Sequence, residues 1–387
     1  MEMMNGQYEA GFPGKVYAGE KSLGGVKEFI EQNGAERVVL LVDRAVAKLP
    51  AVVQFQEMLG AKLAGVIDGV PAEPTCYEIR SVYDQVVQAK ADLLAAIGGG
   101  SVMDMTKVVA AAVSNPEYAE AGFMKPELIT RQPIRPIMAP TTAGTGAEAT
   151  PNAIFLVPEQ ELKVGVVSPA FRASCVVLDP ELTVGLPPQL TASTGLDALC
   201  HAVESYLSIL ANPISRVFSL HASKLIAESL ETAYQDGSDL HAREQMLLGS
   251  FFAGLCLSSS STVAVHALSY PLGGKYHIPH GIANAILLPW VLQLNLPDCR
   301  TQYREIAQVM LPKEQLEAAQ DPAETFVEYI FQLCRRLQIP ESLRGFGVKP
   351  DALDELTENA MQVKRLLLKN PRKLTREEIR SVYERLL

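Results

Sequence analysis

The sequence contains no Cys-x-x-Cys pair, and it has no stretch of about twenty uninterrupted apolar residues. Its six cysteines are scattered along 387 residues, which predicts reduced thiols in the cytoplasm instead of a disulfide framework. We therefore expect no membrane-spanning helix, and the first residues lack the basic-then-apolar pattern of a secretion signal. The chain is also short of positive charge. Its net charge of −10 argues against binding to nucleic acid or to an anionic membrane.

The first half of the chain alternates apolar strands with amphipathic helices. Continuous apolar runs predict strands at 37–43, 64–70 and 93–100. Helical spacing follows these runs, around 51–62, 75–91 and 101–114. Buried strands that alternate with helices imply a parallel sheet covered on both faces. After Leu186-Pro187-Pro188 the pattern becomes almost wholly helical, so we predict an α/β domain over residues 1–185 and an all-α domain over 186–387.

Two histidines lie in a segment that is almost free of charge. Between Glu244 and Asp298 the only charged side chain is Lys275, and this segment contains His266 and His280. An isolated buried histidine is more often a hydrogen-bonded core residue than a metal ligand. Two histidines in one apolar segment, beside glycine and proline residues that signal turns, favour a metal-binding site over two core histidines.

A third histidine and a carboxylate lie upstream. Asp197 and His201 are four residues apart in a stretch with helical spacing, so they share one helix face. Alone, this pattern is more often an ordinary polar helix edge. Together with His266 and His280, however, the pair supplies one carboxylate and three imidazoles, a good ligand set for a divalent transition metal.

A glycine run suggests a phosphate-binding turn. Gly98, Gly99 and Gly100 follow the third predicted strand and open a helix, where free backbone N–H groups suit an anion. The run matches no standard nucleotide motif. The alternative is a plain strand-to-helix turn in which Ser101 is the N-cap and Asp104 closes a capping box, and both interpretations can hold together.

Two further segments suit a dinucleotide. The segment PTTAGTGAE (140–148) places small hydroxyl and glycine residues after a short strand, where they could contact phosphates or the nicotinamide amide. A simple turn explains it equally well. Asp43 ends the first clear strand, and an acidic residue there can bind the ribose hydroxyls of NAD and repel the extra phosphate of NADP. An ordinary turn aspartate is the alternative.

Together these segments resemble the iron-containing (group III) alcohol dehydrogenase family over nearly the whole chain. The resemblance is carried, in order, by GGGSVMDMTK, PTTAGTGAE, DALCHAVESYLS and HALSYPLGGKYHIPHGIANAILLP. It implies a Rossmann-like domain that holds NAD(P), an α-helical domain that holds the metal, and a substrate cleft between them. It implies ligation of Fe2+, or alternatively Zn2+, by Asp197, His201, His266 and His280. It also places these residues at or near the dinucleotide: Gly99, Gly100, Ser101, Asp104, Thr141, Thr142, Thr145, Asn152 and Lys163.

One position departs from the family pattern. Many members have a further histidine four residues after the third ligand, and here Tyr270 occupies that position. His277 lies instead three residues before the last ligand. We predict that Tyr270 positions the substrate and that His277 relays protons or orients His280, with plain packing as the alternative for each.

These features predict a metal-dependent oxidoreductase that transfers a hydride between NAD(H) and a small primary alcohol or aldehyde. The low charge of the metal region favours a neutral substrate, although Lys275 leaves room for an anionic group. A sugar-phosphate cyclase resembling dehydroquinate synthase is one alternative, but it needs basic residues that this region lacks. The others are polyol oxidation of the glycerol dehydrogenase type, a metal-free enzyme resembling maleylacetate reductase, and a non-catalytic metal-binding protein. We expect a cytoplasmic homodimer or larger homo-oligomer.

Overall fold

The structure is a computed structural model that describes residues 7–160 and 162–387. The chain divides into two compact units. We call the first the sheet unit, which contains Gly11–Leu186 and Gly237–Leu247. We call the second the helical unit, which contains Pro187–Asp236 and Leu248–Leu387.

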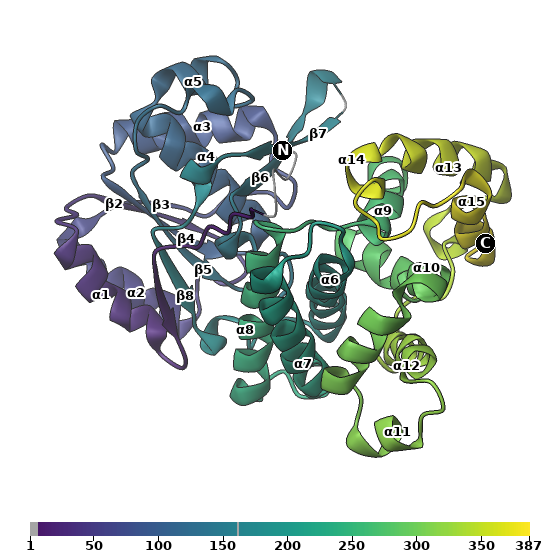
Figure 1. The fold of residues 1–387 in the computed structure, drawn as a ribbon. Helices are drawn as coiled ribbons and strands as arrows, with labels where there is room; N and C mark the ends of the chain where they lie inside the picture. The colour runs from purple at the N-terminus through teal and green to yellow at the C-terminus, as the bar shows by residue number, and fades with distance from the viewer. Residues whose placement is uncertain (1–6, 161) are drawn as a thin grey trace. The chain divides into compact units, whose positions relative to one another are not determined.

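Within the described residues, six parallel strands form the main sheet of the sheet unit (Figure 1). They are β1 (Lys15–Ala18), β2 (Val38–Val42), β3 (Leu63–Ile67), β4 (Leu93–Gly98), β5 (Arg135–Pro140) and β8 (Cys175–Leu178). Their order across the sheet is β1-β8-β5-β4-β2-β3. A separate antiparallel hairpin is formed by β6 (Asn152–Val157) and β7 (Leu162–Val167).

Helices cover both faces of the main sheet (Figure 1). They are α1 (Ser22–Gln32), α2 (Pro50–Leu59), α3 (Cys76–Gln88), α4 (Gly100–Ser114) and α5 (Pro116–Glu120). One face of β2 and β4, with Leu40 and Ala95 among its residues, shares a core with α1 and α2. Helix α4 packs against β4 and β5 on the other face. Because both faces are covered, the central strands are apolar along their whole length.

The strand order identifies where such a sheet binds a ligand. From β2 the chain adds β3 on one side and then returns to add β4, β5 and β8 on the other. This is a doubly wound order, and its direction reverses between β2 and β4. In open α/β sheets, ligands bind outside the carboxyl ends of the strands at this reversal. The segments that follow β2 and β4 begin with Asp43 and with Gly99, respectively.

The predicted elements of the first half are confirmed. The three apolar runs form β2, β3 and β4, and the helical stretches after them form α2, α3 and α4. Helix α3 starts with a complete capping box between Thr75 and Glu78, which satisfies backbone N–H groups at its first turn. The α/β fold class is therefore as the sequence predicts.

The helical unit is built around α6 (Pro188–Leu207). Nearly every residue of α6 from Thr191 onward is buried, as expected for the central helix of a bundle, and the buried set includes the polar residues Asp197, His201 and Glu204. Helices α7 and α10 pack against it. The other helices are α7 (Pro213–Gln235), the second part of α8 (Leu240–Leu257), α9 (Ala264–Tyr276), α10 (His280–Met310), α11 (Lys313–Ala318), α12 (Pro322–Arg336), α13 (Leu353–Gln362), α14 (Lys364–Leu367) and α15 (Arg376–Arg385). None of the helices in the described part of the chain combines the length and apolarity needed to cross a membrane.

Candidate metal and cofactor sites

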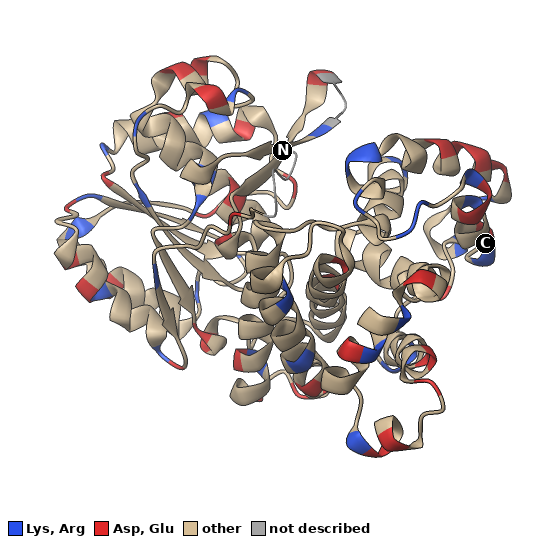
Figure 2. Ribbon diagram, in the orientation of Figure 1, with Lys and Arg blue, Asp and Glu red and all other residues tan. Residues whose placement is uncertain are grey.

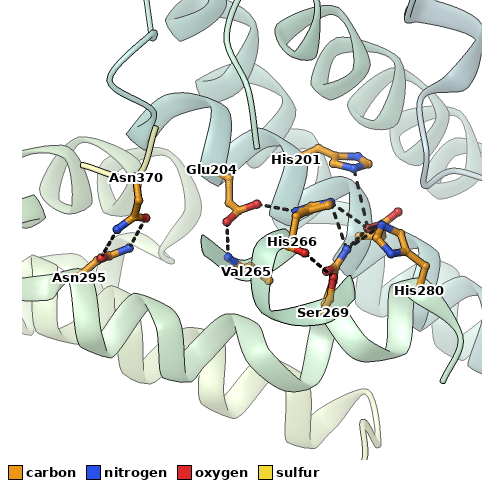
Figure 3. A network of polar contacts seen from close by, with 10 residues as sticks. His201, Glu204, Val265, His266, Ser269, His280, Asn295 and Asn370 are labelled. Atoms are coloured by element: carbon orange, nitrogen blue, oxygen red, sulfur yellow. Dashed lines mark hydrogen bonds and ion pairs between the residues drawn. The ribbon is translucent and has the colours of Figure 1, made fainter. Parts of the chain in front are cut away.

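Three helices of the helical unit bring the four candidate metal ligands together. Helix α6 carries Asp197 and His201 on successive turns, α9 carries His266, and α10 begins at His280. One donor atom from each residue lies within 4.8 Å of the others. The Oδ1 atom of Asp197 is 3.9 Å, 3.8 Å and 3.7 Å from the Nε2 atoms of His201, His266 and His280, respectively. Figure 3 shows the imidazoles converging on one point.

Three of the four residues in this cluster are buried, and the fourth is exposed. The side chains of Asp197, His201 and His266 are at most 7% exposed, whereas that of His280 is 45% exposed. The surrounding ribbon of α9 and the first half of α10 carries almost no charge except at Lys275 (Figure 2). His280 therefore marks the side on which solvent reaches the cluster.

Glu204 fixes the orientation of His266. It lies one turn after His201 on α6, and its Oε2 atom is 2.5 Å from Nδ1 of His266. Its other oxygen accepts the backbone N–H of Val265 at 2.6 Å (Figure 3). With Nδ1–H donating to this carboxylate, Nε2 of His266 keeps its lone pair for a metal. The sequence reasoning missed Glu204, although its helical spacing from Asp197 and His201 places it on their side of α6.

Asn284 lies at the centre of the donor set, one turn after His280 on α10. Its Nδ2 atom is 2.7 Å from Oδ1 of Asp197 and 3.1 Å from Nε2 of both His266 and His280. Its own Oδ1 atom is buried and has no hydrogen-bond partner among the described residues. The positive end of an amide dipole thus occupies the place where the donors converge. The sequence reasoning also missed this residue.

The ionisation of the cluster suits a cation. Burial and the neighbouring imidazoles hold the pKa of His266 well below 6.5, so this ring is neutral. Burial alone would raise the pKa of Asp197, but the three imidazoles and the Asn284 amide outweigh it and keep this pKa below its ordinary value. One carboxylate and three histidine rings have donor atoms within 4.8 Å of one another. This set fits a single divalent ion if the donor atoms move slightly closer together when the ion binds.

The two residues predicted to act beside the metal lie in different places. The ring centroid of Tyr270 is 6.3 Å from that of His280, the exposed residue of the cluster, and Tyr270 is itself 39% exposed. His277 ends α9 in a left-handed conformation with φ 53° and is exposed. No hydrogen bond joins His277 to the cluster within the described residues. The structure brings Tyr270 to the site and leaves His277 outside it, and both roles stay predictions.

The candidate cofactor segments of the sheet unit meet at the carboxyl ends of β2, β4 and β5. The backbone N–H of Asp43 donates to the carbonyl of Ile97 at 2.9 Å, and that of Thr141 donates to the carbonyl of Gly98 at 3.1 Å. A Cβ atom on Gly100 would lie 3.0 Å from Oγ1 of Thr145, so a side chain at position 100 would crowd the second loop. A Cβ atom on Gly99 would lie 3.7 Å from Oγ1 of Thr142.

The capping alternative for the glycine run is wrong. The N-cap of α4 is Gly99, and within the described residues no side chain caps it. The Ser101 hydroxyl instead donates to the carbonyl of Ala72. Asp104 faces away from the helix start, because its carboxylate accepts from the backbone N–H of Ile154 and from Lys107, each at 3.0 Å.

A buried lysine connects two of the remaining predicted cofactor residues. Lys107 is 1% exposed, and its Nζ atom donates to the carboxylate of Asp104 and, at 2.6 Å, to the carbonyl of Asn152. The sequence reasoning did not single out Lys107. Lys163, on β7, is half-exposed and forms an ion pair with Glu73. The structure thus gathers Asp104 and Asn152 around one cation and places Lys163 on the hairpin.

Two family models match the chain. The model described as "Iron-containing alcohol dehydrogenase" matches residues 13–180, and "Fe-containing alcohol dehydrogenase family, C-terminal" matches residues 191–387. The chain is 34% identical to long-chain-alcohol dehydrogenase 1 of Geobacillus thermodenitrificans, over 96% of this chain and 95% of the relative. It is 33% identical to lactaldehyde reductase of Escherichia coli K12, over 95% and 96%. A crystal structure of 1,3-propanediol oxidoreductase superposes with a TM-score of 0.90 at 31% identity, covering 98% of this chain and 100% of that one.

Proposed function

The chain belongs to the iron-containing alcohol dehydrogenase family, and on this basis we propose that Asp197, His201, His266 and His280 hold its catalytic metal. The protein is an oxidoreductase of alcohols and aldehydes that works with NAD(H). The observation that carries the proposed site is the convergence of these donors from three helices to within 4.8 Å. A small primary alcohol or aldehyde is the substrate we propose. The lactaldehyde and 1,3-propanediol named for two relatives support the small size, and the long-chain alcohol named for a third supports only the alcohol group.

The residues of the helical unit have separate roles in the proposed reaction. When bound, a divalent ion supplies Lewis acidity to the substrate oxygen, and NAD(H) supplies or accepts the hydride. Asp197 contributes the negative charge of the site. Glu204 holds His266 in the tautomer whose Nε2 is free. His280 and Tyr270 line the open side, so we assign Tyr270 to substrate positioning and keep the proton relay for His277.

We propose that the sheet unit binds the dinucleotide at the reversal between β2 and β4. In this proposal residues 1–185 form the dinucleotide-binding domain and residues 186–387 the metal-binding domain. Asp43 follows β2, where its charge would favour NAD over NADP. The proposed contact residues are Gly98, Gly99, Gly100, Ser101, Asp104, Thr141, Thr142, Thr145, Asn152 and Lys163. Their common support is the meeting of the two loops at the carboxyl ends of neighbouring parallel strands.

Replacement of one ligand tests the metal site. His266→Ala removes a donor from the buried side of the cluster, so we expect it to lose the bound metal and turnover of alcohol with NAD. Elemental analysis and absorbance of NADH measure the two effects, and the same assay with NADP tests the cofactor preference. His241→Ala, which removes an exposed histidine on α8, is the matched control and should keep both. Full metal content in His266→Ala would overturn the ligand assignment.

We also propose that the enzyme works in the cytoplasm as a homodimer or larger homo-oligomer. All six cysteines are free thiols within the described residues, which suits a reducing compartment. Light scattering on the purified protein measures its mass. A mass at least twice that of one chain is expected, and a single-chain mass at micromolar concentration would contradict the oligomer.

A further inference from the structure

Asn284 is a buried amide beside the four proposed ligands, and their arrangement gives it no role. It lies one turn after His280 on α10 and is fully buried. Its Nδ2 atom is 2.7 Å from Oδ1 of Asp197 and 3.1 Å from Nε2 of both His266 and His280. Its Oδ1 atom has no hydrogen-bond partner among the described residues. Buried polar atoms are seldom left unsatisfied, so this oxygen needs an explanation.

The amide of Asn284 competes with a metal for the same electron pairs. Nδ1 of His266 donates to Glu204, so Nε2 of this ring carries the lone pair and accepts from Nδ2 of Asn284. A primary amide has two N–H hydrogens, whereas three donor atoms of the cluster lie within 3.1 Å of Nδ2. The amide therefore satisfies the cluster incompletely. Because an ion and these hydrogens cannot use the same lone pairs, the amide must turn when a metal binds.

The place that Nδ2 of Asn284 occupies suits a ligand atom. Two donor atoms that lie about 2.1 Å from one ion, at roughly 90–110° to each other, are about 3.0–3.4 Å apart. The distances from Nδ2 to the three nearest donor atoms of the cluster, 2.7 Å, 3.1 Å and 3.1 Å, are close to this spacing. The distances of 3.7–3.9 Å from Oδ1 of Asp197 to the histidine Nε2 atoms are longer than it. An amide nitrogen has no lone pair to offer a metal, but an amide oxygen has two.

A half-turn of the side chain brings the oxygen to this place. Rotation about the Cβ–Cγ bond exchanges Nδ2 and Oδ1, which are nearly equal in size, without moving the backbone. The backbone of α10 has little room to move near this point. A Cβ atom on Gly281 would lie 2.5 Å from the backbone oxygen of Ser193 on α6. Rotation in place is therefore the movement that disturbs the packing least.

We propose that Asn284 is a fifth metal ligand, whose amide makes this half-turn when the ion binds and gives Oδ1 to it. This inference rests on the proposed function and adds one residue to its metal site. Before the ion binds, Nδ2 donates to Asp197, so the buried carboxylate is not left unpaired. After the ion binds, Oδ1 lies among the other donor atoms. One side chain thus stabilises the site in both states.

The test loads the full-length, metal-free protein with Co2+ alone and measures affinity and the visible spectrum. Four-coordinate Co2+ absorbs visible light more strongly than five-coordinate or six-coordinate Co2+, so the spectrum reports the number of ligands. Asn284→Leu keeps the size of the side chain and removes its oxygen. We expect this variant to bind Co2+ at least roughly tenfold more weakly, measured by competition with a chelator, and to absorb more strongly. Asn284→Asp restores an oxygen at the same place, so it should bind Co2+ at least as tightly as the wild type and keep the weaker absorption.

Asn295→Leu is the matched control. It makes the same substitution at another buried asparagine of α10, which pairs with Asn370 and not with the cluster (Figure 3). We expect the affinity for Co2+ and the spectrum to stay at their wild-type values in this variant. Circular dichroism establishes that each variant folds.

The outcomes separate a ligand from a supporting residue. If Asn284→Leu and Asn284→Asp weaken Co2+ binding equally, Asn284 acts only by donating to Asp197, and the proposal is overturned. A wild-type spectrum in Asn284→Leu also overturns it, and the four other proposed ligands then stand. If Asn284→Leu does not fold, Asn284→Asp decides, since weaker binding than in the wild type contradicts a fifth ligand. If the wild type binds no Co2+, the proposed metal site fails as well.

Discussion

Single residues that are not metal donors decide how well the donors work. Glu204 is the clearest case, because it is buried, touches Nδ1 of His266 and also accepts the N–H of Val265. Burial raises the pKa of Glu204 to about 7, against the pull of the backbone N–H groups that it accepts. Such carboxylate partners set the tautomer and basicity of a ligand histidine.

Glu204→Gln should therefore weaken metal binding without removing a ligand. The amide still accepts the N–H of Val265, but the charge that polarises His266 is lost. We expect the metal affinity to fall by roughly tenfold to a hundredfold, measured by competition with a chelator. Glu305→Gln is a matched control, since Glu305 pairs with Tyr206 elsewhere in the same unit. Equal affinities in the two variants would show that Glu204 does not act through His266.

A second buried carboxyl, Glu148, should make stability depend on pH. It is 1% exposed, and burial raises its pKa from 4.5 to about 7 although Lys107 pulls the other way. The unfolded chain gives up this proton at lower pH than the folded one. Stability is therefore lost as the pH rises from 4.5 to about 7, and the loss then levels off at a total on the order of 3 kcal/mol.

Glu148→Gln removes the ionisable carboxyl and with it this pH-dependent loss of stability. We expect the variant to lose less stability than the wild type between about pH 5 and about pH 8, measured by chemical denaturation at each pH. Glu120→Gln, which changes an exposed glutamate of α5, should behave as the wild type does. Parallel pH profiles for Glu148→Gln and the wild type would contradict the prediction.

At the scale of helices, the metal site depends on the close approach of α10 to α6. A Cβ atom on Gly281 would lie 2.5 Å from the backbone oxygen of Ser193 on α6, so no side chain fits at position 281 without moving a helix. His280 precedes this glycine. The distance between His280 and Asp197 therefore depends on a residue that donates nothing to the metal.

Gly281→Ala should push the start of α10 away from α6. We expect a destabilisation of about 1–3 kcal/mol from overpacking, together with weaker metal binding through His280. Thermal denaturation and chelator competition measure the two effects. In Gly274→Ala the new Cβ atom meets no described atom within 4 Å, so this variant of α9 should keep its metal and be as stable as the wild type or slightly more so. Unchanged metal affinity in Gly281→Ala would show that α10 adjusts without moving His280.

The elements differ in how far their sequence reveals them. Strands β2 and β4 are uninterrupted apolar runs, so their pattern predicts them. Strand β1 has four residues and a largely exposed edge, and it carries no such signal. Helix α1 begins after Lys21, whose φ is 60°, and no described side chain caps it, so the usual start signal is missing.

The residues of the candidate site also divide into those that the sequence predicts and those that it does not. The four proposed ligands stand out by their spacing and by the low charge around them, and Tyr270 stands out by its place in the family pattern. Glu204 and Asn284 could have been found, because each lies one turn from a proposed ligand on the same helix. The packing of α14 on α9 could not, since the two helices lie far apart in the sequence and only the folded chain brings them together.

On the scale of the whole molecule, the two units carry different parts of the chemistry. The four proposed metal donors belong to the helical unit, and the glycine-rich loops belong to the sheet unit. The segment Gly237–Leu247 belongs to the sheet unit although it lies among helices in the sequence. Buried Arg243 holds it there by donating to the carbonyls of Gly237, at 3.0 Å, and Leu186, at 3.3 Å.

Because metal binding stabilises only the state that binds it, removal of the metal should destabilise the helical unit alone. An ion present at about one hundred times its dissociation constant stabilises by about 2.7 kcal/mol, which corresponds to roughly 5–10 °C in Tm for a unit of this size. We expect calorimetry of the metal-loaded protein to show that EDTA lowers one transition by that amount and leaves a second, from the sheet unit, in place. In His266→Ala the chelator should have no effect on either transition. A single transition that shifts as a whole would mean that the two units unfold together, so that the metal stabilises the sheet unit as well.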